Sequence, residues 1–218
     1  MGTAILIAVN AVAISFIAGV SIWWFVLGVV IIIASIPVLW VLVLHSYQKQ
    51  RIITFLNPES DPAGAGYHIL QSKVAIGSGG LNGLGYRHGT QSSLDFLPEK
   101  HTDFIFSVVA EEFGFIGAFI VLLLVFCIVF RVLLVALNSA SKYGKFVAMG
   151  VAINFFLYVM INVGMVMGIF PIVGVPFPLL SYGGTVVVSI MISFGFVHNV
   201  KIHEKLTDKE LQIDRYSK

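Results

Sequence analysis

The sequence predicts an all-α polytopic membrane protein with about five transmembrane helices, a large outer loop and a re-entrant proline-rich segment. Two observations carry this prediction. Of the 218 residues, 58% are hydrophobic and only 11% are charged, whereas soluble domains carry about 25% charged residues. Five stretches are also apolar over roughly the 20 residues that a helix needs to cross a bilayer. So few charges cannot cover a soluble surface of this size, so we assign the chain to the membrane class.

The first two apolar stretches, residues 3–20 and 22–44, are separated by a very short link, so we expect them to form a helical hairpin. Trp23 and Trp24 at this link suit the membrane–water interface, where tryptophan is enriched. Pro37 is expected to kink the second helix, because proline removes one hydrogen bond of the helical ladder.

Three further apolar stretches lie at residues 104–130, 146–168 and 180–199, and a polar tail follows at 200–218. With the first two stretches and the long polar loop at 45–103, they are expected to form a single membrane domain spanning 1–218. Because the chain begins almost immediately in an apolar stretch, we expect it to be the C-terminal part of a longer protein.

Lysine and arginine in the short connections predict the orientation of these helices. The link 131–145 carries Arg131, Lys142 and Lys145 but no acidic residue, and the tail is rich in lysine. Such flanks mark the cytoplasmic side of a membrane protein. We therefore expect the C-terminus to be cytoplasmic and the long loop to lie outside.

The long loop, 45–103, holds most of the polar residues outside the tail, and loops of this length are usually functional or disordered. Aromatic and aliphatic residues at intervals favour a folded loop. Residues 47–56 predict a short interfacial helix. Asp61 before Pro62 predicts the start of another helix, which the glycines at 77–80 are expected to end. The glycines at 77–85 fail the tests for a phosphate-binding loop, because Asn82 stands where a glycine is required and Tyr86 where a lysine is required. A flexible turn or a close approach of the backbone to a ligand remains as the interpretation.

The densest group of candidate site residues lies where this loop re-enters the membrane, at Glu99, Lys100, His101 and Asp103. A carboxylate at a bilayer surface can serve as a general base if a hydroxyl comes within hydrogen-bond reach. The alternative for Asp103 is an acidic residue at a helix N-terminus, where the helix dipole favours it. For Glu99 and Lys100 the alternative is an ordinary solvated loop end.

Basic residues recur along the loop, and they predict a pocket for a lipid-linked phosphate or diphosphate, with Lys73, Arg87, Lys100 and His101 as candidates. The alternative is that they balance the acidic residues of the loop. The histidines show no tight ligand spacing, so no metal site is predicted. No cofactor is required by the sequence, although a divalent cation could share the neutralisation of a diphosphate.

Two acidic residues, Glu111 and Glu112, lie inside an apolar helix, where a carboxylate costs about 2.5–3.5 kcal/mol on insertion scales. They are expected to face a cavity or to pair with lysines. Farther along, three prolines between 168 and 184 exclude a continuous helix, so this segment is expected to fold back into the protein. Ser181 and Tyr182 would then be offered to a cavity. Asn162 in the preceding helix is interpreted as a residue that forms a hydrogen bond with a neighbouring helix.

Six ordered motifs resemble the SEDS family, the shape, elongation, division and sporulation proteins, and they match its rod-shape branch better than its division branch. They are DPAGAGYH at 61–68, QSK at 71–73, GSGG at 77–80, FLPEKHTDFIF at 96–106, AEE at 110–112 and PFPLLSYGG at 176–184. The resemblance implies the C-terminal half of a ten-span fold in the bacterial inner membrane, with the large loop outside.

The resemblance further implies a peptidoglycan glycosyltransferase that polymerises lipid II into glycan strands during elongation and rod-shape maintenance. Its partner would be a class B penicillin-binding protein of the elongation machinery. Asp103 matches the family's essential loop aspartate. Because only the C-terminal half matches, catalysis by this polypeptide alone does not follow. The alternatives are a lipid II flippase, which the membrane-depth glutamates would suit, and a non-catalytic scaffold for the transpeptidase.

Overall fold

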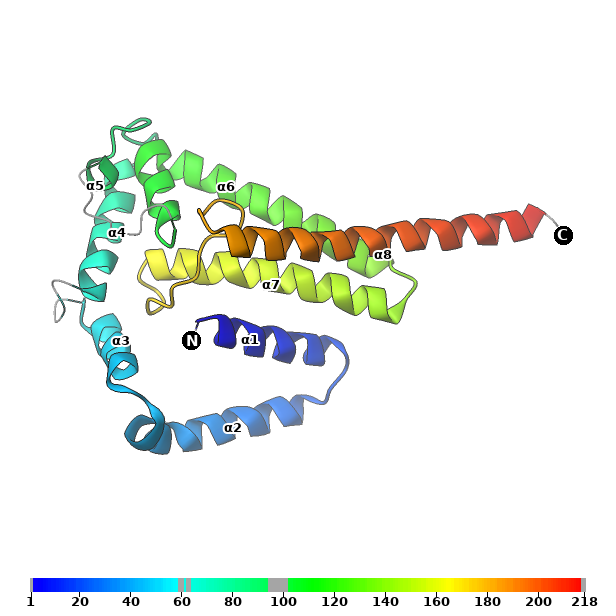
Figure 1. The fold of residues 1–218 in the computed structure, drawn as a ribbon, viewed down its shortest axis with the longest axis horizontal. Helices are drawn as coiled ribbons and strands as arrows, with labels where there is room; N and C mark the ends of the chain where they lie inside the picture. The colour runs from blue at the N-terminus through cyan, green and yellow to red at the C-terminus, as the bar shows by residue number, and fades with distance from the viewer. Residues whose placement is uncertain (1, 59–60, 62–63, 94–101, 217–218) are drawn as a thin grey trace.

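The computed structural model describes residues 2–58, 61, 64–93 and 102–216, and these residues confirm the predicted all-α class (Figure 1). Every regular element among them is a helix. The elements are α1 (Gly2–Ile17), α2 (Ile22–Val38), η1 (Leu39–Val43), α3 (Ser46–Leu56), α4 (Ala65–Gly79), α5 (Thr90–Ser93), α6 (Ile105–Asn138), α7 (Lys142–Val166) and α8 (Gly184–Tyr216).

Four of the described helices are long and apolar enough to cross a bilayer: Ile22–Leu42, Ile105–Asn138, Lys142–Val166 and Gly184–Glu204. The first helix, α1, is equally apolar but has only 16 residues, fewer than the roughly 20 that span a typical bilayer. The predicted set of about five spans is therefore present as four long helices and one short one.

Helices α6, α7 and α8 form the bundle, and α1 packs against α7 (Figure 1). Aromatic and aliphatic side chains from this bundle and from the segment between α7 and α8 make up the main core, among them Phe106, Val125, Phe155, Val159, Met165, Val166, Phe177 and Ile190. Helix α2 lies apart from the bundle and has no buried residue. It contains Pro37, where a kink is predicted, and the π-helical turn η1 follows directly.

The last helix begins at Gly184 rather than near residue 180 and continues through the tail to Tyr216. Residues 168–183, here named the proline-rich segment, are not helical, and Val175, Phe177 and Pro178 are buried within it. This agrees with a segment that folds back into the protein, because proline cannot continue a helix. The segment lies at the same end of the bundle as α3, α4 and α5 (Figure 1).

Helix α6 is broken at Gly114, whose φ of 67° and ψ of −164° lie outside helical geometry. The loop after α4 satisfies the backbone groups that the break releases. Leu84 and Gly85 donate their N–H groups to the carbonyls of Glu111 and Glu112, each at 3.0 Å. In return, the N–H of Phe115 donates to the carbonyl of Gly80 at 2.9 Å.

The glycine cluster allows this loop to approach α6 closely. A Cβ atom at Gly79 would collide with the carbonyl oxygen of Ala110, and one at Gly83 would collide with that of Glu112. The predicted turn is present at residues 80–82. The backbone of these glycines approaches α6 of the same chain, and its approach to a ligand stays a prediction. Helix α4 accordingly extends through the first two glycines of the cluster, Gly77 and Gly79.

Candidate active site

Asp103 lies in the turn formed by residues 102–104, which leads directly into α6, and its side chain is half-buried. The carboxylate rests against Gly174 of the proline-rich segment. A Cβ atom at Gly174 would lie 3.4 Å from Oδ2 of Asp103. Gly174 has a φ of 69°, which L-residues rarely adopt. The proline-rich segment thus supplies a surface without a side chain directly beside the carboxylate.

Asn162 of α7 holds the Asp103 turn onto this segment. Its side-chain amide donates one hydrogen bond to the backbone carbonyl of Asp103 at 2.8 Å and another to that of Val175 at 2.7 Å. The side chain is fully buried. Losing it would leave two buried carbonyls without this donor, at a cost of about 1–3 kcal/mol each.

Ser181 makes a second connection between the same two segments. Its hydroxyl donates to the backbone carbonyl of Thr102 at 2.5 Å and accepts from the N–H of Phe177 at 2.7 Å. The rings of Phe106 and Phe177 stack nearby, with centroids 5.8 Å apart and planes 1° from parallel. The backbone carbonyls of Thr102 and of Asp103 itself are therefore both held, which restricts where the Asp103 carboxylate can point.

Two cations contact the proline-rich segment from the loop side. Arg51 of α3 donates from Nη1 to the carbonyl of Ile172 at 3.2 Å. Lys73 of α4 lies over Gly168, where a Cβ atom would come within 2.7 Å of Nζ. Since Ile172 and Gly174 are two residues apart, their Cα atoms are at most about 7 Å apart. Arg51 and Asp103 thus approach neighbouring parts of one short segment.

Lys73 also lies at the C-terminal end of α7, where the helix dipole favours a cation. Beside it, the hydroxyl of Ser72 donates to the carbonyl of Val166 at 2.8 Å, in a buried contact. These two neighbours join α4 to the end of α7. The lysine therefore contributes to local structure at a position from which its charge also reaches the proline-rich segment.

Two other predicted site residues, Arg87 and Tyr182, are exposed. Arg87 is exposed, has a φ of 63°, and belongs to the loop that pairs with α6 at Glu111 and Glu112, about two turns beyond the Asp103 turn. Tyr182 is 86% exposed. Ser181 is buried, and its hydroxyl is engaged by the two backbone groups described above. Glu99, Lys100 and His101 lie outside the described residues.

The membrane-depth glutamates are buried at the break in α6. The carboxylate of Glu111 accepts a hydrogen bond of 2.8 Å from the N–H of Gln91 and one of 3.4 Å from the hydroxyl of Thr90. Glu111 is fully buried and Glu112 nearly so. The Gln91 contact places Glu111 at the N-terminus of the short helix α5, where a carboxylate compensates free backbone N–H groups. Glu111 thereby anchors the outer loop to α6.

Sequence reasoning did not identify Asn162 and Arg51 as parts of this site. The position of Asn162 in an apolar helix did indicate that its side chain has buried hydrogen-bond partners. The sequence could not show that one partner is the backbone of Asp103. Arg51 carried no comparable signal, because an arginine in an interfacial helix is expected to face lipid head groups. Among the described residues, no group of three or more His, Cys, Asp and Glu side chains could hold a metal ion.

Comparisons with known proteins show the family to which the chain belongs. Residues 1–206 match the profile of the FtsW/RodA/SpoVE family, described as cell cycle proteins. The chain is 48% identical over 213 residues to the peptidoglycan glycosyltransferase MrdB of Escherichia coli K12, a match covering 97% of this chain and 57% of that protein. It is 46% identical over 180 residues to the peptidoglycan glycosyltransferase RodA of Treponema pallidum, covering 83% and 42%.

A solved structure described under "Structural coordination of polymerization and crosslinking by a peptidoglycan synthase complex" superposes with a TM-score of 0.75 at 26% identity. It covers 93% of this chain and 55% of that one. The chain thus spans about half the length of the relatives it matches. It belongs to the SEDS family, that of the FtsW, RodA and SpoVE cell cycle proteins, and within it the chain is RodA-like.

Proposed function

We propose that this chain is the catalytic half of a peptidoglycan glycosyltransferase that polymerises lipid II into glycan strands, with Asp103 as the general base. The observation that carries the proposal is the fixed position of Asp103. Asn162 and Ser181 secure the backbone on both sides of its carboxylate, and Gly174 leaves space beside it. Relatives at 46% and 48% identity bear the name peptidoglycan glycosyltransferase.

In the proposed reaction, a hydroxyl oxygen of the acceptor sugar attacks the anomeric carbon of the donor sugar. The new C–O bond forms while the bond from that carbon to the lipid diphosphate breaks. The hydroxyl proton passes to the Asp103 carboxylate and then to water. A positioned general base typically contributes 10²- to 10⁴-fold to such a step.

The leaving diphosphate gains negative charge as its bond breaks, so nearby cations stabilise the transition state. Arg51 and Lys73 are our candidates, because both contact the proline-rich segment against which Asp103 rests. Arginine can bind phosphate oxygens through two parallel hydrogen bonds, whereas lysine acts as a point charge. Lys100, His101 and Arg87 remain predicted substrate-binding residues of the same loop, and a divalent cation that shares the neutralisation remains part of the proposal.

The reaction requires the long loop to face the compartment where glycan strands grow. The proposal therefore places the chain in the bacterial inner membrane with residues 45–103 outside and the C-terminus in the cytoplasm. The lysines and arginines of 131–145 and of the tail support this orientation. Its partner would be a class B penicillin-binding protein. The supporting observation is that the solved relative belongs to a complex named for polymerization and crosslinking.

Glycan formation from purified lipid II in nanodiscs tests the proposal. The chain is produced alone and together with the N-terminal portion of the E. coli relative that the match leaves uncovered. We expect glycan strands with at least the combined sample, and their loss with Asp103→Asn. A combined sample that assembles and binds lipid II but forms no strands would contradict the catalytic assignment and favour a scaffold.

A further inference from the structure

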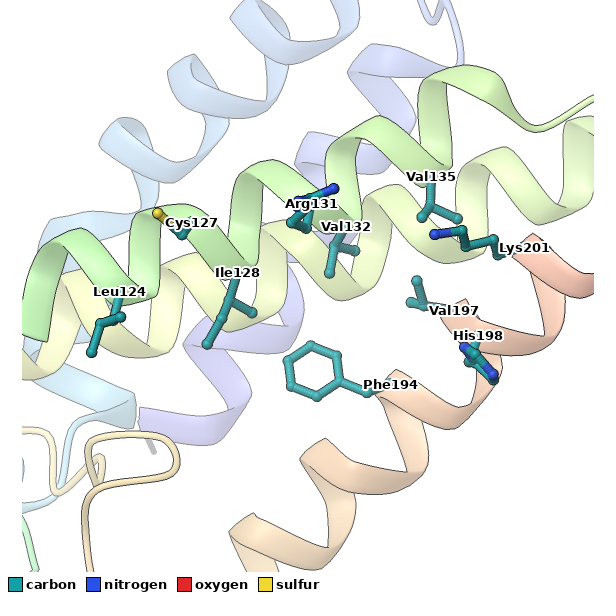
Figure 2. Close-up of a pocket in the computed structure, with 10 residues that line it drawn as sticks. All are labelled: Leu124, Cys127, Ile128, Arg131, Val132, Val135, Phe194, Val197, His198 and Lys201. Carbon is teal, nitrogen blue, oxygen red and sulfur yellow. The ribbon is translucent and has the colours of Figure 1, made fainter.

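A groove between α6 and α8, away from the candidate active site, has the lining of a lipid-binding site (Figure 2). Its volume is about 620 Å³. One wall is a single face of α6, with residues spaced by three and four positions, and the other is a single face of α8. The lining residues are Leu124, Cys127, Ile128, Arg131, Val132, Val135, Phe194, Val197, His198 and Lys201.

The groove is apolar along most of its length and basic at one end. Leu124 and Ile128 lie at the apolar end, His198 and Lys201 lie at the other, and Arg131 lies between them, as Figure 2 shows. Lys201 is the eighteenth residue of α8, about 26 Å along the helix from its start. That distance approaches the roughly 30 Å thickness of the hydrocarbon core. The basic end therefore lies near the membrane boundary on the side of the α6–α7 link.

We propose that this groove binds an anionic phospholipid of that leaflet, with an acyl chain along the apolar part and the head-group phosphate between Arg131 and Lys201. Two independent properties select this occupant. The apolar part fits a hydrocarbon chain, which the bilayer supplies without a desolvation cost. The cations at its boundary end complement a phosphate, and basic pockets between transmembrane helices on the cytoplasmic side bind anionic head groups.

The combination of an apolar groove with cations near the membrane boundary favours a phospholipid over other occupants. A purely apolar helix of another polypeptide would leave Arg131 and Lys201 without counter-charges at the groove end. A soluble anion would not use the apolar part of the groove, which both Phe194 and Ile128 line. The proposed site is independent of Asp103, so it stands whether or not the chain transfers sugars.

Native mass spectrometry of the full chain, titrated with phosphatidylglycerol or phosphatidylcholine of identical acyl chains, tests this site. We expect phosphatidylglycerol to bind about tenfold more tightly. Arg131→Gln and Lys201→Gln should each weaken it about fivefold, since one cation near a membrane surface contributes about that factor. Arg131→Lys should retain most of the preference. Equal affinity for the two lipids would overturn the proposal.

Lys142→Gln is the matched control, because Lys142 begins α7 on the same side of the membrane but does not line the groove. We expect it to change phosphatidylglycerol affinity by less than twofold. If it weakens binding as much as Arg131→Gln does, the preference arises from diffuse surface charge, and the groove is not the site.

The single cysteine of the chain, Cys127, is exposed and lines the groove, so it can report what fills it. A benzophenone attached to Cys127 in nanodiscs should, on illumination, yield adducts with the mass of phosphatidylglycerol. Arg131→Gln should shift these adducts toward phosphatidylcholine in a mixed bilayer. Adducts with a second polypeptide would show that protein covers the groove, and would overturn the proposal.

Discussion

The side-chain amide of Asn162, buried in the last turns of α7, donates a 2.8 Å hydrogen bond to the backbone carbonyl of Asp103. The same amide group donates to Val175 of the proline-rich segment. One buried side chain therefore sets the spacing between the candidate base and the segment beside it. This makes Asn162 a positioning residue rather than a catalytic one, since it contacts the backbone of Asp103 and not its carboxylate.

Replacing Asn162 with aspartate should lower the rate of glycan formation more than it changes the KM for lipid II. A carboxylate cannot donate to the two carbonyls that the amide now satisfies. We expect a loss of about 10-fold or more in kcat and a destabilisation of about 2–4 kcal/mol. Polymerisation kinetics and thermal unfolding in detergent measure these two effects.

The matched control is Asn154→Asp, an equally conservative change two turns earlier in the same helix, where the side chain is half-buried. A fall in stability with unchanged kcat for the folded fraction of Asn162→Asp would show that Asn162 has only a structural role.

Replacing Gly174 with alanine should reduce activity because it alters the surface beside the Asp103 carboxylate. The φ of 69° makes a Cβ atom unfavourable by about 1–2 kcal/mol, and that atom would lie 3.4 Å from Oδ2. We expect a several-fold lower polymerisation rate. Gly184→Ala serves as the control, since nothing lies within 4 Å of its Cβ position and its φ is not positive. Equal rates for the two variants would remove Gly174 from the site.

Replacing Gly114 with alanine should destabilise the fold through the break in α6. The new Cβ would have a positive φ and would collide with the backbone of Leu81 and Gly83. We expect a loss of about 3 kcal/mol or more, because rigid backbone must move. Gly195→Ala, in open space within helical α8, should instead be neutral or stabilising by up to about 1 kcal/mol. Thermal unfolding of both variants measures the difference.

Replacing Arg51 or Lys73 with glutamine should slow the departure of the diphosphate. Arg51 donates to Ile172, and Lys73 lies over Gly168, so both charges adjoin the proline-rich segment. We expect each change to reduce kcat/KM for lipid II by about 10-fold, with Lys73→Arg retaining more activity than Lys73→Gln. Lys145→Gln, in the first turn of α7 and therefore at its opposite end, is the control. Polymerisation rates that fall equally for all three glutamine variants would argue against local charge stabilisation.

The sequence alone predicted the all-α class, the short interfacial helix after residue 46 and the non-helical proline-rich segment. These features follow from hydropathy and from proline, which act locally. The break in α6 was not predicted, because a single glycine in an apolar helix is compatible with a straight helix. Helix α6 can break at Gly114 because the loop at 80–85 supplies replacement hydrogen bonds. Such pairing between segments that are distant in the chain leaves no periodic signal in the sequence.

The same distinction applies to the site. Asp103 was identifiable from its motif and from its place at the end of the outer loop. Its supports were not, because Asn162 lies 59 residues away and Ser181 binds the turn from 79 residues away. Ser181 was expected to face a cavity, whereas its hydroxyl is engaged by backbone groups. A serine within a proline-rich stretch does not reveal which carbonyl it will meet.

The most direct test of the central claim is the single-turnover rate of glycan formation with Asp103→Asn in the assembled, lipid II-saturated enzyme. Asparagine preserves the size of the side chain and the contacts of the backbone but cannot accept the hydroxyl proton. We expect the affinity for lipid II to stay within about twofold of that of the unmodified enzyme, and the thermal stability to stay within about 1 kcal/mol. We expect the chemical step to slow by at least about 10²-fold. A chemical step that proceeds at the unmodified rate would contradict it.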